Sequence, residues 1–255
     1  MFLAVDIGNS STKFGIFQDD ILIKTERLDF DKTLTADIYQ TKISDLLQQY
    51  HINECLIASV NEELTFVVKK AIDNLYKIES LLLDSKINIG IKIKAPNPEQ
   101  AGADRIANTY AASVLYPKPS ITIDVGTATT FDVVDKDGCF IGGVIMPGLN
   151  MQLKSLNDNT SKLPIIKVGP SYKAIGDDTE SCILSGVIRG HSSAIEGLIR
   201  QCEEELGEKA AIIATGGYSK LISQYMNPPF EYIEPDLTLK GIKLIYNLNK
   251  ANYFV

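Results

Sequence analysis

A short motif occurs twice in this 255-residue chain, and the repeat constrains the fold more than any other feature. The first copy starts at Asp6 and reads Asp-Ile-Gly-Asn-Ser-Ser-Thr. The second starts at Asp124, 118 positions later, and reads Asp-Val-Gly-Thr-Ala-Thr-Thr. Aspartate, glycine and threonine coincide at the first, third and seventh positions. Each copy follows an apolar run and continues as a β-rich run into a turn, at 18–20 and 135–138. This pattern predicts three strands in each half, and therefore a duplicated fold of two similar lobes.

The segments that follow each copy complete the predicted lobes. Hydrophobic periodicity predicts helices and buried strands after both motifs. The helices are expected at 35–50, 61–76, 99–115, 176–206 (one long helix or two) and 237–249, and the strands at 55–60 and 210–214. Two prolines within 116–119 exclude a continuous helix there. The sequence thus predicts an α/β protein with lobes over 1–116 and 117–255, each a mixed sheet with flanking helices.

Composition excludes several classes of protein. Hydrophobic residues make up 45% of the chain and charged residues 22%, which is typical of a protein with a packed core. No run approaches the roughly 20 apolar residues that a membrane span needs, and Asp6 ends the apolar start of the chain. The formal net charge of −7 argues against binding to nucleic acid, whose phosphates are held by clustered Lys and Arg. A cytoplasmic protein without membrane or nucleic-acid partners is expected.

The cysteines and histidines are too few and too scattered for zinc or for most nucleophilic schemes. The chain has two histidines and four cysteines, and no two cysteines form a Cys-x-x-Cys pair. We expect His191 to be a packed or surface residue rather than a base. We expect the thiols to be buried and structural: Cys55, Cys139, Cys182 and Cys202.

Three glycine-containing turns at predicted strand ends carry the chemistry. They start at Asp6, Asp124 and Thr215, the last reading Thr-Gly-Gly. A single Asp-x-Gly turn is more often structural than functional, because many hairpins use Asp and Gly merely to turn. Two copies together with a later Thr-Gly-Gly favour phosphate binding, since backbone N–H groups of such turns can cradle anions. Lys13 can add a point charge. The pattern is neither a P-loop nor a dinucleotide fingerprint.

A fourth motif, Gly102-Ala103-Asp104-Arg105, starts the predicted helix near the end of the first half. Its carboxylate can accept a hydrogen bond from a substrate hydroxyl, and its guanidinium can hold an anionic group in a fork. The structural alternative is that Asp104 only stabilises the start of the helix through the helix dipole. The motif alone leaves both interpretations open.

Repeated Asp-x-Gly hairpins with a late Thr-Gly-Gly resemble the acetate and sugar kinase, heat-shock and actin superfamily, in which the repeated hairpins contact phosphates. With Gly-Ala-Asp-Arg-Ile-Ala-Asn at 102–108 and Gly-Gly-Val-Ile-Met-Pro-Gly-Leu at 142–149, the chain resembles the type III pantothenate kinases over 1–250. The resemblance implies a duplicated actin-like (ribonuclease H-like) fold and ATP-dependent phosphorylation of pantothenate to 4′-phosphopantothenate, the first step of coenzyme A biosynthesis. It also implies Mg²⁺ with ATP, a monovalent cation (K⁺ or NH₄⁺) and a homodimer with its active site near the interface.

The resemblance assigns roles to individual residues. Asp104 is implied as the catalytic proton acceptor, Asp124 as the monovalent-cation ligand, and Asp6 as a ligand of Mg²⁺ through water. Implied substrate-binding residues are Gly102, Ala103, Asp104, Arg105 and Thr179. Implied ATP-binding residues are Asp6, Ile7, Gly8, Asn9, Ser10, Ser11, Thr12, Lys13, Gly126, Thr127, Thr215, Gly216 and Gly217.

Two positions depart from the family pattern. Ser10 stands where threonine is commoner and keeps the hydroxyl, and Ala95 stands where many members have a tyrosine near the pantothenate pocket. Two alternative functions remain at this point: another small-molecule kinase of the same superfamily, and a non-catalytic nucleotide-binding regulatory protein.

Overall fold

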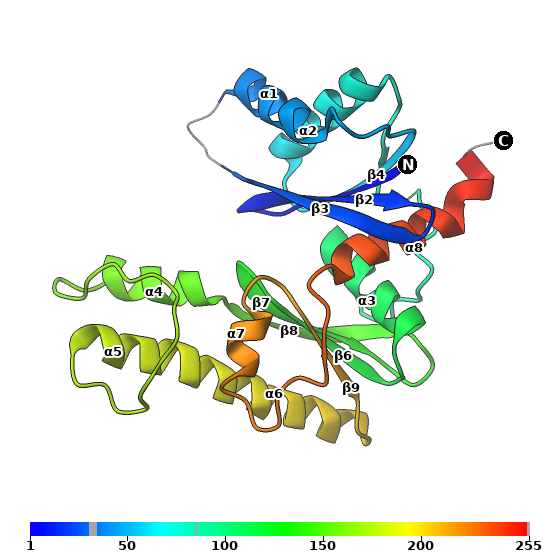
Figure 1. Ribbon diagram of the computed structural model, residues 1–255. Coiled ribbons are helices and arrows are strands. Elements are labelled where there is room, and N and C mark those ends of the chain that lie inside the picture. Colours follow the sequence, from blue (N-terminus) through cyan, green and yellow to red (C-terminus); the bar gives the residue numbers. More distant parts are fainter. Residues whose placement is uncertain (31–34, 85, 254–255) are drawn as a thin grey trace. The chain divides into compact units, whose positions relative to one another are not determined.

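The computed structural model describes residues 1–30, 35–84 and 86–253, with side chains up to residue 250 (Figure 1). The chain forms two compact units. Unit 1 comprises Met1–Val114 together with Leu237–Val255, and unit 2 comprises Leu115–Asp236. Within the described ranges, no helix has both the length and the apolar character that a membrane span requires.

Unit 1 is built on a five-stranded mixed sheet in the order β3-β2-β1-β4-β5. Its strands are β1 (Phe2–Ile7), β2 (Ser11–Gln18), β3 (Ile21–Asp29), β4 (Glu54–Ser59) and β5 (Leu81–Leu82). Strand β1 is antiparallel to β2 and parallel to β4, so it occupies the centre of the sheet. The predicted three-stranded unit and the strand at 55–60 are confirmed.

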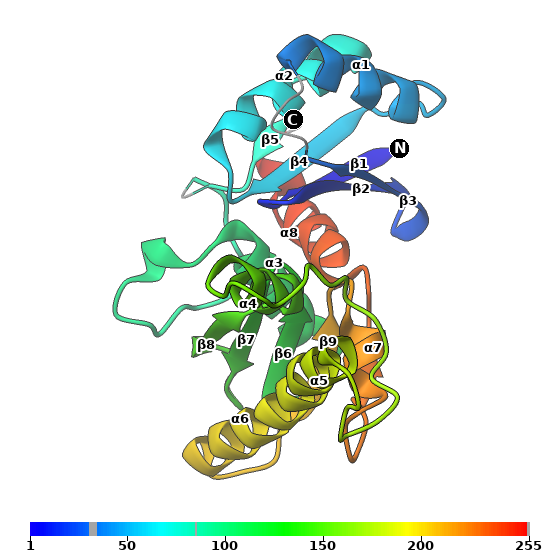
Figure 2. The same ribbon diagram turned by 90° about the vertical axis from the view of Figure 1, so that its left-hand side faces the viewer.

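Helices cover both faces of the first sheet (Figure 2). On one face, α1 (Ala36–Leu47) and α2 (Glu62–Tyr76) pack on alternate strand residues such as Val5 and Ile57. On the other face, α3 (Ala103–Leu115) and α8 (Leu237–Tyr253) pack on Phe2, Ala4 and Leu56. Because successive side chains of a strand point to opposite faces of the sheet, β1 contributes residues to the cores on both faces. A short 3₁₀ turn, Pro98–Gln100, precedes α3.

The final helix differs from the domain boundaries expected from the sequence. Residues 237–255 were assigned to the second lobe, but α8 belongs to unit 1. Gly241 explains the close packing, because a Cβ added there would lie 2.0 Å from the carbonyl oxygen of Ala107 in α3. Thr238 donates to the side-chain oxygen of Asn108 at 2.8 Å. The helix itself was predicted, whereas its place in unit 1 depends on these contacts, which are distant in sequence.

Unit 2 repeats the topology of unit 1, with a sheet in the order β10-β9-β6-β7-β8. Its strands are β6 (Ser120–Val125), β7 (Ala128–Val134), β8 (Phe140–Pro147), β9 (Ala211–Thr215) and β10 (Tyr232–Ile233). Central strand β6 is antiparallel to β7 and parallel to β9, as β1 is to β2 and β4. The equivalent strand orders confirm the predicted duplication.

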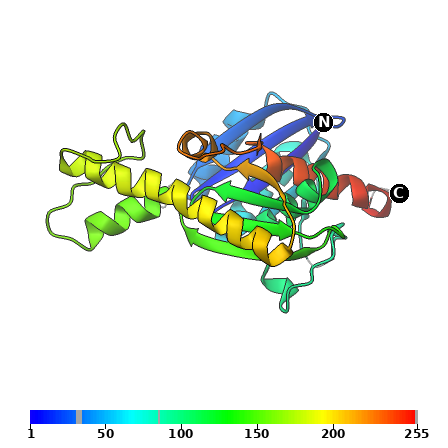
Figure 3. The same cartoon turned by 90° about the horizontal axis from the view of Figure 1, so that it is seen from below.

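The helices of unit 2 are α4 (Leu149–Asp158), α5 (Thr179–Leu184), α6 (Gly190–Leu206) and α7 (Ser219–Ser223). A π-helical turn, Ser185–Arg189, joins α5 to α6 without a break. Figure 3 shows α6 running across the second sheet. Ile195 of α6 and Ile188 of the π turn belong to the core of unit 2. The predicted helix at 176–206 therefore starts at Thr179 and contains one π turn.

The two hairpins differ by one residue in their loops. Asp6 pairs with Lys13 across the first hairpin, whereas Asp124 pairs with Thr130 across the second, one position earlier in the repeat. The threonines at the seventh motif position are therefore not structurally equivalent. Thr12, opposite Ile7, corresponds to Thr129, opposite Val125. The offset of 118 positions therefore relates structurally equivalent residues along the first strand of each hairpin, but not in the strand after the loop.

The expectation that all four cysteines are buried is wrong. Cys55 and Cys139 are buried, but Cys202 is half-buried and Cys182 is exposed. All four are free thiols. Cys55 faces the core of unit 1, where burial raises its pKa to about 12, so it is an inert structural thiol. Cys182 lies in α5, and the apolar residues of this short helix do not indicate which of its faces is exposed.

Candidate functional site

The first hairpin presents a short polar loop between β1 and β2. Gly8 N–H donates to the carbonyl of Ser11 at 3.0 Å, which closes the loop, and Phe30 N–H donates to the carbonyl of Ser10 at 2.8 Å. The side chains of Asn9 and Ser10 are exposed at the tip. The loop is therefore fixed by backbone hydrogen bonds while its polar tip remains accessible.

Asp6 and Lys13 lie directly opposite each other on the face of the sheet that carries α3 and α8. Asp6 follows Phe2 and Ala4 at alternate positions of β1, and both of those residues belong to that core. Both Asp6 and Lys13 are half-buried. A carboxylate and an ammonium thus stand as a cross-strand pair at the loop end of the hairpin.

Two of the predicted ATP-binding side chains point elsewhere. Ile7 is fully buried in the core under α1 and α2. Thr12 is also fully buried, and its hydroxyl lies 3.1 Å from the Tyr39 hydroxyl of α1. β1 and β2 turn both side chains into the core, so only the backbone groups of these two residues are left for the predicted contacts with ATP.

The Gly-Ala-Asp-Arg motif lies at the carboxyl ends of β1 and β4. Val60 directly follows β4, and its N–H donates to the carbonyl of Ile7 at 3.0 Å. A Cβ on Gly102 would lie 3.3 Å from Val60 Cγ1 and 2.5 Å from Asp104 Oδ1. A side chain at position 102 would therefore displace the Asp104 carboxylate. Unit 1 brings the motif that contains Asp104 to the same edge of the sheet as the loop after Asp6.

Asp104 is a half-buried carboxyl group in the first turn of α3. Burial raises its pKa, because the charged form loses solvation. The N–H of Arg105 donates to Oδ1 at 2.8 Å, and this hydrogen bond together with the Arg105 charge opposes the increase. The net direction is upward, which makes Asp104 a stronger base than an exposed aspartate.

The second hairpin and the Thr-Gly-Gly turn meet at Asp124. Strand β6 pairs with β9, which places Thr215 beside Asp124. A Cβ on Gly216 would lie 2.3 Å from Asp124 Oδ1, and one on Gly126 would lie 3.1 Å from the same oxygen. Gly216 also has φ +86°, a conformation that favours glycine. Two glycines from separate motifs therefore frame one carboxylate.

Helix α4 begins against the same loop. A Cβ on Gly148, its N-cap residue, would lie 2.2 Å from the carbonyl oxygen of Thr127 and 2.6 Å from that of Gly126. Asn150 of α4 donates to the Tyr218 hydroxyl at 2.8 Å, and Tyr218 N–H donates to the carbonyl of Val125 at 3.1 Å. The hairpin loop, the Thr-Gly-Gly turn and α4 therefore form one connected structure, with Thr127 exposed at its tip.

His191 of α6 holds the second hairpin through a buried network. Gln152 of α4 donates through Nε2 to His191 Nδ1 at 2.8 Å and to the carbonyl of Pro147 at 2.9 Å. His191 Nε2 lies 3.0 Å from the hydroxyl of buried Thr129, to which it then donates. Burial lowers the pKa of His191, consistent with a neutral ring. Of the two expected positions, packed or at the surface, His191 takes the packed one.

The network predicts a pH-dependent contribution to stability. Because native His191 must stay neutral, the unfolded chain takes up a proton that the native chain does not as pH falls below about 6.5. The free energy of unfolding is thus reduced by this residue on acidification. In urea denaturation at pH 7.5 and 5.5, the stability advantage of wild type over His191→Asn should shrink at pH 5.5. An equal advantage at both values would contradict the neutral assignment.

Thr179 lies on a different element of unit 2 from the two loops. It is the first residue of α5 and is exposed, directly after the N-cap residue Asp178. Asp178 and Ser181 form a reciprocal capping box, in which Ser181 N–H donates to Asp178 Oδ1 at 2.7 Å. The start of α5 is therefore sharply defined although it lies at the surface.

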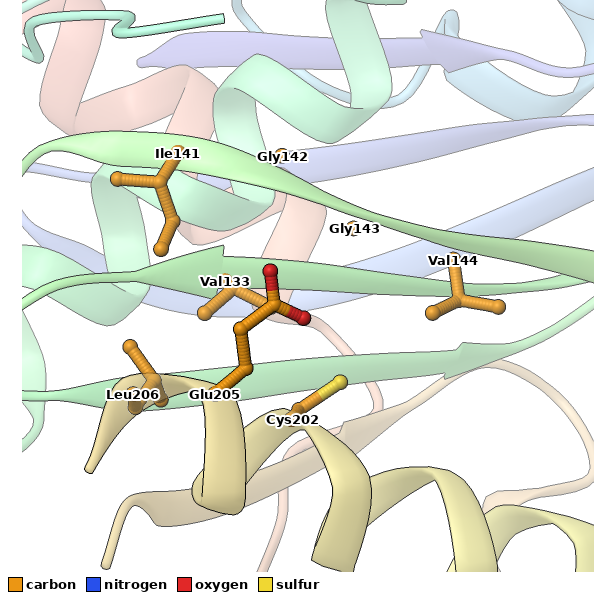
Figure 4. Close-up of a pocket in the computed structure, with 8 residues that line it drawn as sticks. All are labelled: Val133, Ile141, Gly142, Gly143, Val144, Cys202, Glu205 and Leu206. Carbon is orange, nitrogen blue, oxygen red and sulfur yellow. The ribbon is translucent and has the colours of Figure 1, made fainter. Parts of the chain in front are cut away.

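Two surface pockets of unit 2 differ in their relation to these motifs. One, of about 190 Å³, lies between β7–β8 and the end of α6, where Cys202 and Glu205 point toward Val133 and Val144 (Figure 4). None of the predicted site residues lines it. The other, of about 730 Å³, lies between α4 and α5 and is mainly apolar, with Pro147, Gln152 and Val187 in its lining. It borders the His191 network.

Sequence reasoning missed the residues that support the loops. Tyr39, Gln152 and Arg189 carry no motif, and their partners are distant in sequence. Only Gly148 had a visible signal, because it lies in the Met-Pro-Gly-Leu segment that contributes to the family resemblance. Ala95, the departure near the predicted substrate segment, is half-buried in the loop before α3.

Comparison with known proteins adds independent information. The family model described as type III pantothenate kinase matches residues 2–201. A type III pantothenate kinase of Dehalococcoides mccartyi (strain CBDB1) is 40% identical over 254 residues, which covers 98% of this chain and 96% of the relative.

Solved structures support the fold. A Baf family transcriptional activator from Campylobacter jejuni aligns with a TM-score of 0.63 at 21% identity, covering 98% of this chain and 99% of the other. MreB 5 of Spiroplasma citri, bound to AMPPNP, aligns with a TM-score of 0.54 at 12% identity, covering 98% and 97%. At these identities the likeness concerns the fold alone, and it agrees with the predicted duplicated actin-like architecture. Because the family model matches most of this chain, the chain belongs to the type III pantothenate kinase family.

Proposed function

We propose that this protein transfers the γ-phosphate of ATP to pantothenate, forming 4′-phosphopantothenate in the cytoplasm as the first step of coenzyme A biosynthesis. The observation that carries the proposal is the half-buried Asp104 carboxyl group, which has a raised pKa and lies in the first turn of α3, at the strand edge where the Asp6 loop lies. Family membership supports this reaction over another small-molecule kinase or a non-catalytic regulator.

Each hairpin has a loop suited to bind phosphate groups of ATP. In unit 1, the exposed loop of Gly8, Asn9 and Ser10 would contact phosphate through backbone N–H groups, with Lys13 adding positive charge. In unit 2, Gly126 and Thr127 would do the same from the second loop, and Gly216 and Gly217 would bind the adenosine. Such loops hold the nucleotide without large rearrangement, because their backbone hydrogen bonds already fix them.

The aspartates suit hard cations. Asp6 offers one carboxylate at a strand end, and Mg²⁺ commonly takes one or two carboxylates, several waters and substrate phosphates. Asp124 offers a second carboxylate, framed by the backbones of Gly126 and Gly216, and is assigned to K⁺ or NH₄⁺. When bound, these cations would neutralise charge that develops on the phosphate oxygens.

The proton would move to Asp104. Phosphoryl transfer has a loose transition state, so positioning and electrostatics dominate. Asp104 would orient the primary hydroxyl of pantothenate and accept its proton as the bond to phosphorus forms. Arg105 would hold the pantothenate carboxylate, since a guanidinium binds carboxylates through paired N–H groups. Gly102 and Ala103 would contact the substrate through the backbone.

A homodimer with its active site near the interface is proposed as the working form. Unit 2 offers apolar surface for a second copy between α4 and α5, including exposed Met151. The adjoining segment carries Ile165, Tyr172 and Ile175, each more than four-fifths exposed. Large exposed apolar residues gathered on one region commonly mark an interface. Thr179 starts α5 in this region and would contact pantothenate there.

The experiment that tests the function is a panel of phosphoacceptors with ATP and Mg²⁺, followed by release of ADP. We expect turnover with pantothenate, and none above background with acetate or glucose. The rate should fall strongly when sodium replaces potassium, because Asp124 is assigned to the monovalent cation. Full activity in sodium alone would remove that role, and turnover with another acceptor only would favour the rival kinase function.

A further inference from the structure

The segment 171–178, which leads into Thr179, is fixed although most of it is exposed. Tyr172 and Ile175 are both 88% exposed, and Lys173, Ala174, Asp177 and Asp178 are exposed as well. Hydrophobic burial therefore contributes little to its order. Among the described residues, its position instead depends on polar contacts with the helix that runs from α5 into α6.

Arg189 makes the central contact. Its Nε donates to the Ser171 hydroxyl at 3.1 Å, and one terminal nitrogen donates to the Ser171 carbonyl at 2.9 Å. The guanidinium also lies over the ring of Tyr225, 5.1 Å from the ring centroid. The Tyr225 hydroxyl in turn accepts from Ser171 N–H at 2.7 Å. Arg189, Tyr225 and Ser171 thus form a closed set of contacts at the start of the segment.

Two further contacts fix the middle of the segment. The Ser185 hydroxyl donates to the carbonyl of Ala174 at 2.6 Å. A Cβ on Gly176 would lie 2.3 Å from the backbone nitrogen of Cys182, so the chain passes directly against the first turns of α5. Ser185 and Arg189 are the first and last residues of the π turn. Such turns are often found at functional sites, which agrees with a role for this one.

We propose that Arg189 is a positioning residue for pantothenate, acting through segment 171–178 to place Thr179. This inference rests on the proposed function, because the role of Thr179 does. A lysine cannot replace the guanidinium here, since one ammonium group cannot make both bonds to Ser171 and stack on Tyr225 in the same way. The predicted consequence concerns pantothenate and not ATP, whose proposed loops in unit 2 are held by other contacts.

The test uses the full chain with Arg189→Lys. We expect the KM for pantothenate to rise about tenfold, the loss expected for one charged hydrogen bond. The KM for ATP and kcat should each change less than about twofold. The matched control is Arg200→Lys, an exposed arginine on the same helix, which should match wild type in all three constants. Tyr225→Phe, which removes the acceptor for Ser171 N–H, should also raise the KM for pantothenate.

Hydrogen–deuterium exchange provides a readout that does not depend on activity. In Arg189→Lys the amides of 171–178 should exchange faster, while those of 126–128 and 215–217 should exchange as in wild type. Light scattering should show the same oligomer for all variants. Unchanged exchange at 171–178 would overturn the anchoring role, and faster exchange with an unchanged KM for pantothenate would overturn its link to the substrate. Absence of pantothenate turnover in wild type would instead refute the proposed function. The exchange measurement would still show whether Arg189 anchors segment 171–178.

Discussion

Replacing Asp104 with asparagine is expected to lower kcat by about 10²–10⁴-fold, the range that a general base typically contributes. The substitution keeps the shape of the side chain and removes its ability to accept a proton. The KM for ATP should stay close to the wild-type value, because the proposed ATP loops are formed by other segments. Steady-state kinetics with each substrate varied in turn separates these effects.

The pH dependence gives a second signature of the same base. Burial raises the pKa of Asp104, so the acid limb of the rate profile should lie above about 3.9, the ordinary value for aspartate. Asp37→Asn is the matched control, since Asp37 is an exposed aspartate in the first turn of α1. Wild-type turnover in Asp104→Asn would contradict the assignment and leave Asp104 as a residue that stabilises the start of α3.

Gly216→Ala is expected to damage both stability and ATP binding. The new Cβ would lie 2.3 Å from Asp124 Oδ1 and 2.6 Å from the backbone carbon of Val125, in a central strand that cannot shift easily. The left-handed backbone at φ +86° adds strain. Together these effects should lower the free energy of unfolding by about 2–4 kcal/mol and raise the KM for ATP at least tenfold.

Gly197→Ala provides the control for this substitution. Gly197 lies within α6, and alanine is the better helix former. Among the described residues, nothing outside the neighbouring backbone of the helix lies within 4 Å of a Cβ added there. The control should be neutral or slightly stabilised and fully active. If Gly216→Ala binds ATP and unfolds like wild type, the Thr-Gly-Gly turn does not frame Asp124 as described.

Much of the fold was predictable because local patterns agree with it. The Asp-x-Gly repeat predicted both three-stranded units, and the amphipathic segments predicted α1, α2 and α3 to within a few residues at each end. The place of α8 in unit 1 was not predictable, because it depends on the close approach of Gly241 to Ala107, 134 positions earlier along the chain. Periodicity reports which face of a helix is apolar, but not which sheet it will cover.

In the candidate site as well, residues in local motifs were predictable and residues that depend on distant contacts were not. Motifs located Asp6, Asp104 and Asp124 at strand or helix ends, because Asp-x-Gly turns and helix starts have local signatures. The one-residue difference between the hairpin loops was hidden, so Thr130 appeared equivalent to Thr12 when Thr129 is the true counterpart. Supporting side chains such as His191 become visible only when distant segments pack together.

The most direct measurement of the central claim is mass spectrometry of pantothenate incubated with the wild-type protein, Mg-ATP and potassium. The account predicts stoichiometric formation of ADP and of pantothenate carrying one phosphate on its primary hydroxyl, with no product when Asp104→Asn is used at the same short time. Release of ADP that leaves pantothenate unmodified, or no reaction in any monovalent salt, would contradict it.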